Sequence, residues 1–85
     1  MKEAIQRIIA ALQKPLSDSE RDDGWSQQIK TGYIPVFSKL LAQIEHGEKP
    51  PYFGIARSLD AYGVGSGELY EAMLRVANEA NDQLR

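Results

Sequence analysis

The stretch from residue 35 to residue 47, PVFSKLLAQIEHG, decides the fold class. Its apolar side chains recur at the spacing of one helix face and are Val36, Phe37, Leu40, Leu41 and Ile44. Pro35 suits the first turn of a helix, and His46 with Gly47 suits its end, where positive charge and a left-handed glycine are favoured. We therefore expect a helix that begins at Pro35 and buries one face.

Apolar side chains recur at the same helical spacing in the N-terminal region. Ile5, Ile8, Ile9 and Leu12 place one apolar stripe on a helix of about residues 2–14. We expect Pro15 to end this helix, because the residue before a proline is pushed out of the α region.

A weaker helix is expected next. Ser17 and Glu20 have the spacing of a capping box, in which each side chain bonds the other residue's backbone N–H. Gly24 would lie inside this helix and cost about 1 kcal/mol relative to alanine. Only Trp25 and Ile29 are strong apolar positions, and residues 32–35 are expected to break the helix. The segment from Asp18 to Tyr33 is therefore predicted to open at little cost.

Two further helices are expected in the C-terminal half. One covers residues 52–62 and ends at Gly63, and the other is capped by Ser66 and has an apolar stripe wide enough for two neighbours. With no strand alternation, the prediction is an all-α fold, a single compact bundle of four or five short helices in one domain of residues 1–85. The predicted core comprises Ile9, Leu12, Phe37, Leu40, Leu41, Ile44, Leu59, Leu69, Met73 and Leu74.

Composition narrows the classes of function. The chain has 85 residues, a formal net charge of −2 and no cysteine, so disulfides and thiolate metal sites are excluded. No apolar run is long enough for a signal peptide or a membrane span, and we expect a cytoplasmic protein that does not bind membranes.

Known chemical motifs fit poorly. The glycines of residues 63–67 lack the spacing of a dinucleotide fingerprint and the lysine of a P-loop. A calcium loop aligned on Gly24 would place Arg21 and Lys30 at ligand positions. His46 is the single histidine and has no nucleophile or metal-ligand motif beside it. We therefore predict no catalytic residue, no metal, no cofactor and no enzymatic activity.

A helix-turn-helix DNA-binding regulator is the alternative function. Gly63 could be the turn glycine, with the last helix as the reading helix. Residues 66–82 carry four acids and one base, however, and that sign of charge disfavours contact with phosphates. The prediction is no binding to nucleic acid.

Acidic and aromatic residues gather around the weak helix. Residues 17–23 carry four acids and one base, and aromatic side chains follow at two nearby breaks. Aromatic residues are enriched at protein interfaces, and acidic clusters steer basic partners. The predicted partner-binding residues are Asp18, Glu20, Asp22, Asp23, Trp25 and Tyr33.

The sequence thus predicts a small soluble protein-interaction module whose partner is another protein with a basic surface. The inhibitors, antitoxins and immunity proteins of bacteria belong to this physical class, and size and acidity are what suggest them. A competing interpretation is that Trp25 is wholly buried and that the acids only cap a helix. The sequence leaves the oligomeric state open.

Overall fold

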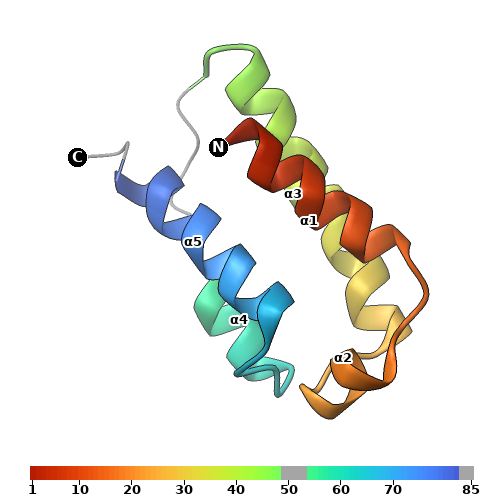
Figure 1. Ribbon diagram of the computed structural model, residues 1–85. Helices are drawn as coiled ribbons and strands as arrows, with labels where there is room; N and C mark the ends of the chain where they lie inside the picture. Colours follow the sequence, from red (N-terminus) through yellow and green to blue (C-terminus); the bar gives the residue numbers. More distant parts are fainter. Residues whose placement is uncertain (49–53, 83–85) are drawn as a thin grey trace.

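Five helices make up the computed structural model, which describes residues 1–48 and 54–82 (Figure 1). In chain order they are α1 (Lys2–Gln13), α2 (Asp18–Asp22), α3 (Gln27–Glu45), α4 (Ile55–Ala61) and α5 (Glu68–Asp82). These two ranges contain no strand. The predicted all-α class and number of helices are confirmed.

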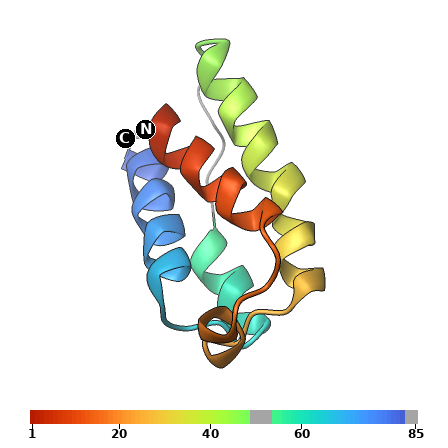
Figure 2. The ribbon, with the colours of Figure 1, turned by 45° about the vertical axis from the view of Figure 1, so that its right-hand side comes forward.

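The helices pack in two pairs that face each other. α1 lies along α3, α4 lies along α5, and α1 also packs against α5 (Figure 1). The two neighbours expected for α5 are therefore α1 and α4. Seen after a 45° turn, α2 closes one end of the molecule, opposite the start of α1 and the end of α5 (Figure 2).

Several predicted helix ends are confirmed. α1 ends at Gln13, just before Pro15. The Glu20 N–H donates to the Ser17 hydroxyl at 3.2 Å, and the Ser17 N–H donates to the Glu20 carboxylate at 2.9 Å, which completes the capping box. Gly47 follows α3 with a φ of 71°, the left-handed conformation that glycine adopts at low cost.

The predicted break at residues 32–35 is wrong. α3 runs without interruption from Gln27 to Glu45, with Pro35 inside it. A proline inside a helix removes one backbone hydrogen bond and costs about 3 kcal/mol. The cost is offset because one continuous face of α3 buries Tyr33, Phe37 and Leu40 on both sides of the proline.

Gly24 does not lie inside a helix, and the expectation that it interrupts the helix begun by Ser17 is therefore wrong. It follows the end of α2 with a φ of 103°. A Cβ atom at Gly24 would lie 2.5 Å from the carbonyl oxygen of Gly63. The connection between α2 and α3 therefore packs directly on the connection between α4 and α5, and glycine permits this close approach.

The C-terminal helices differ from the prediction at their starts. α4 begins at Ile55, and Tyr52 and Phe53 of the predicted helix lie outside the described residues. Before α5, the carbonyl of Gly67 accepts from the Glu71 N–H, so Gly67 holds the capping position predicted for Ser66. The Ser66 hydroxyl donates to the Asp23 carboxylate at 3.5 Å.

The core is larger than predicted. Five predicted members are fully buried, and five pack against the core while partly exposed, because they lie at the edges of their helix faces. The fully buried ones are Leu12, Phe37, Leu40, Leu59 and Met73, and the partly exposed ones are Ile9, Leu41, Ile44, Leu69 and Leu74. The prediction missed Ile5, Ile8, Trp25, Tyr33, Ile55, Val64, Val76, Ala77 and Ala80.

Candidate functional site

A fully buried lysine fixes the acidic helix α2. The Lys30 ammonium donates to Glu20 Oε1 at 2.8 Å and to the carbonyl of Lys14 at 3.0 Å. The carbonyl of Pro15, at 3.5 Å, is a third acceptor. Carbonyls at the end of α1 have no helical partner and carry partial negative charge, which the ammonium neutralises. One side chain of α3 thus joins the end of α1 to α2.

Glu20 is engaged inside the fold. Its Oε1 accepts from both the Ser17 N–H and Lys30, and the side chain is 20% exposed. Partial burial works to raise the pKa of Glu20, but the hydrogen bonds from Lys30 and Ser17 and the charge of Lys30 lower it overall. The carboxylate is held ionised on the inner side of α2.

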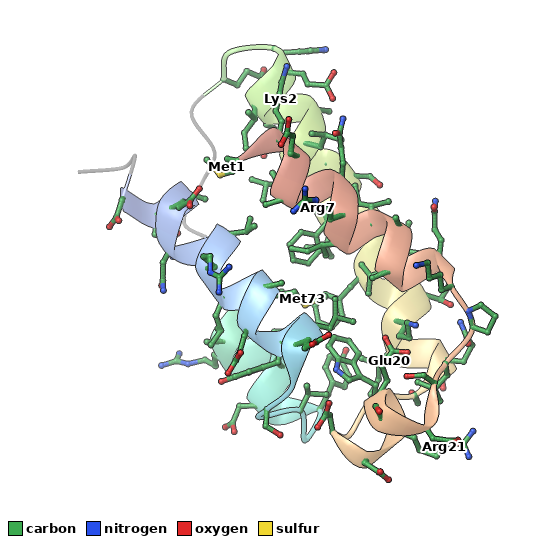
Figure 3. The ribbon with its side chains drawn as sticks, in the orientation of Figure 1. Met1, Lys2, Arg7, Glu20, Arg21 and Met73 are labelled. Carbon is green, nitrogen blue, oxygen red and sulfur yellow. The ribbon has the colours of Figure 1, made fainter. Side chains whose placement is uncertain are left out.

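A groove of about 710 Å³ opens between α1, α2 and α5. The apolar part of its lining comes from α1 and α5 and consists of Ile8, Ala11, Leu69 and Ala72. Its charged part consists of Arg7 and Lys14 near α1, and of Glu20, Asp23 and Glu68 near α2 and the start of α5. Figure 3 shows two of these residues, Arg7 on α1 and Glu20 at α2. The groove therefore combines an apolar surface with walls of opposite charge.

The predicted acidic residues fall into two groups. Glu20 and Asp23 line the groove between α1, α2 and α5. Asp18 and Asp22 are exposed on α2 and lie outside that lining. Together with Glu68 they make one end of the molecule acidic.

Trp25 and Tyr33 are core residues, with 3% and 5% of their surfaces exposed. This corrects the expectation that either ring presents a surface anchor, and the interpretation of Trp25 as buried is the one that the structure bears out. The rings meet edge to face with centroids 6.1 Å apart. The indole Nε1 of Trp25 is buried and has no hydrogen-bond partner among the described residues.

The Tyr33 hydroxyl faces α4. It lies 2.6 Å from the Ser58 hydroxyl, and its ring contacts Tyr62 edge to face at 6.1 Å. Burial raises the pKa of Tyr33, while the hydrogen bond with Ser58 works in the opposite direction. Tyr33 therefore joins α3 to α4 as a neutral phenol.

Sequence reasoning missed most of the groove, in particular Arg7, Lys14 and Glu68. Arg7 and Lys14 belong to α1 and its C-terminal end, Glu68 begins α5, and only the packing of α1 against α5 brings the two groups together. The sequence signal that could have indicated the groove is the pair Ala11 and Ala72, because small residues on two facing helices leave room for a depression between them.

Nowhere in residues 1–48 and 54–82 do three histidine, aspartate or glutamate side chains gather closely enough to hold a metal ion. Within the same ranges, every helix is too short or too polar to cross a bilayer.

Comparison of the chain with protein-family models, with curated proteins and with solved structures finds no match.

Proposed function

We propose that the chain is a small protein-interaction module without chemistry of its own. Its partner is another protein with a basic surface, and the binding site is the groove between α1, α2 and α5. The observation that carries the proposal is that two predicted acidic residues, Glu20 and Asp23, line the same groove as an apolar surface. Apolar burial supplies affinity at an interface, and charge supplies orientation and the rate of association.

The residues that line the groove indicate what kind of partner segment would bind there. An amphipathic segment would place apolar side chains over Leu69 and Ala72 and a cation near Glu68 and Asp23. Arg7 and Lys14 on the opposite wall would repel that cation, so the segment would bind in one orientation.

The buried ion pair supports this proposal. α2 contributes no buried residue of its own, yet Lys30 holds it in a fixed position through Glu20. A buried ion pair is rarely a net source of stability, and its best-attested use is to fix one arrangement. Because α2 is already held in place, its acidic side chains lose less conformational entropy on binding than those of a mobile segment would.

Modules of this kind act by covering a surface of the partner, as inhibitors, antitoxins and immunity proteins do. A chain without cysteine has no disulfide to form, which supports a cytoplasmic location.

Selection from a displayed library of random short peptides tests the proposal. The selected peptides should combine apolar residues with Lys or Arg, because these match the lining of the groove. Ala72→Arg and Glu68→Lys should each weaken the selected peptides about tenfold or more. Glu71→Lys is the matched control, because it makes the same change of charge on an exposed residue of α5 outside the lining. Acidic selected peptides, or equal losses in Glu68→Lys and Glu71→Lys, would refute the proposal.

A further inference from the structure

The apolar part of the groove between α1, α2 and α5 offers a bound segment little backbone to pair with. Ile8 and Ala11 lie within α1, and Ala72 lies within α5. Inside an α-helix, backbone N–H and C=O groups bond one another four residues apart. An extended segment buried there would leave its own backbone groups without partners, whereas a helix pairs them internally. Residues 1–48 and 54–82 also contain no strand whose edge could take up an extended segment.

The groove is about two helical turns long. Arg7 and Lys14 both line it and are seven residues apart at α1 and its end, which corresponds to about 10 Å. Ala11 and Ala72 have short side chains on facing walls, and short side chains let a further helix approach closely.

The end of the groove beside α2 is negative. Asp23 and Glu68 both line this end, and the charge of Glu20 is matched by Lys30 at 2.8 Å. Lys14 opposes one of the two remaining acids, so one negative charge is left over. The partial charges at the end of α1 and the start of α5 have opposite signs and offset each other.

The other end of the groove is positive. Arg7 is exposed and is the charged lining residue farthest along α1 from α2. No ion pair within residues 1–48 and 54–82 engages it. A segment bound along the groove therefore meets a cation at one end and a net negative charge about 10 Å away at the other.

We infer that the segment bound in this groove is an α-helix of the partner protein that carries an acid and a cation seven residues apart on one face. The inference rests on the proposed function and adds the conformation of the segment and the spacing of its charges. Seven residues span nearly two turns, so the acid reaches Arg7 while the cation reaches Asp23 and Glu68. Apolar side chains three and four residues after the acid lie over Ala11 and Ala72.

A synthetic peptide of about 14 residues is the probe, because shorter isolated helices are marginal in water. It has a glutamate, leucines three and four residues later and a lysine seven residues later, with alanine elsewhere. Glutamate precedes lysine because this order also stabilises the free helix. The peptide should bind with a Kd of about 100 μM or below, and its helix content by circular dichroism should rise on binding.

A matched pair of variants locates the peptide. Ala72→Arg should weaken binding about tenfold or more, because it fills the middle of the groove. A second groove, of about 540 Å³, lies between α3 and α4 and is lined by Val36. Val36→Arg places the same side chain in that groove and should leave binding of the peptide unchanged.

Two changed peptides test the helical conformation. Proline placed five residues after the glutamate faces away from the groove, so it removes no contact but breaks the helix. It should weaken binding about tenfold or more, whereas an extended segment would tolerate it. Moving the lysine to that same position turns its charge away from Asp23 and Glu68 and should also weaken binding.

An exchange of charges tests the spacing. Arg7→Glu should weaken binding of the original peptide about fivefold, because two acids then meet. A peptide with lysine in place of its glutamate should recover that loss on the Arg7→Glu variant. Lys39→Glu is the control, since it makes the same change of charge at an exposed residue of α3 outside the lining.

The outcomes separate this inference from the proposed function. Tolerance of proline, or no recovery on Arg7→Glu, would overturn the inference and leave the proposed function in place, because the groove still binds a peptide. The same holds if the designed peptide does not bind while library peptides sensitive to Ala72→Arg do. If no peptide of either kind depends on Ala72, both are refuted.

Discussion

The ion pair between Lys30 and Glu20 is buried unevenly, since the lysine is fully buried and the glutamate is 20% exposed. Glu20→Ala would leave a buried ammonium without its carboxylate, which should cost about 3 kcal/mol or more of the free energy of unfolding. Lys30→Met would remove the buried charge, keep an apolar side chain in its place and leave Glu20 in reach of water. Urea unfolding should show a clearly smaller loss for Lys30→Met, and equal losses would contradict this.

The stability of the protein should depend on pH through Glu20. Its pKa in the folded state lies below the ordinary value of 4.5, so its contribution is fully present above pH 4.5. The contribution is lost as the pH falls below 4.5 toward the folded-state pKa, because the unfolded chain then binds the proton more readily. Thermal unfolding between pH 6 and pH 3 should show this acid loss. Glu20→Gln should reduce it, whereas Asp18→Asn, at an exposed neighbour in the same helix, serves as the control and should change it little.

Two glycines should respond in opposite ways to alanine. Gly24→Ala should destabilise the fold, because φ is 103° and the new Cβ would lie 2.5 Å from the carbonyl oxygen of Gly63. Gly32→Ala should stabilise the fold by about 0.5–1 kcal/mol, since the helix gains propensity and the Cβ meets nothing within 4 Å. Chemical denaturation of both variants at low protein concentration measures the two effects. A loss of stability in Gly32→Ala would contradict the geometry of α3.

At the scale of the helix, α3 contributes Tyr33, Phe37 and Leu40 to the hydrophobic core. Phe37 is fully buried, and Phe37→Ala should cost about 3–5 kcal/mol. Replacing a fully buried leucine by alanine usually costs about 2–5 kcal/mol. Leu41 is only partly buried, so the loss should fall near or below the lower end of that range. Denaturant unfolding ranks the two variants, and a larger loss for Leu41→Ala would show that Leu41 is the better packed residue.

Sequence reasoning failed at α3 because the tendency of proline and glycine to break helices was given more weight than the helical spacing of the apolar side chains. Pro35 and Gly32 each disfavour the interior of a helix, so the helix was expected to begin at Pro35. Tyr33, Phe37 and Leu40 nevertheless continue one apolar face across both residues without a shift of phase. The capping box and the end at Pro15 were predictable because both depend on neighbours in the chain.

Lys30 and the groove between α1, α2 and α5 could not be predicted in the same way. A lysine is expected at the surface, and nothing in the local sequence shows that the end of α1 and Glu20 surround its ammonium. Arg7 and Glu68 share the groove only through the packing of α1 against α5. The acidic residues were found because they are contiguous, whereas the apolar surface beside them depends on tertiary packing.

At the scale of the molecule, the two grooves share no lining residue. One lies between α1, α2 and α5 and the other between α3 and α4. A partner bound in one groove therefore leaves the lining of the other groove uncovered.

The distribution of charge over the whole molecule leads to the last prediction, that the protein has no sequence-specific affinity for DNA. The start of α5 is the end that a reading helix would present to base edges. Glu68 and Glu71 lie in its first turn, and the Asp23 carboxylate reaches Ser66 just before it. Arg75 lies further along α5, beyond its N-terminal turns. Phosphates would meet negative charge at this end, and few counterions would be released. Fluorescence anisotropy with random and genomic duplexes at several salt concentrations should show no saturable binding, and tight binding with a steep dependence on salt would refute the prediction.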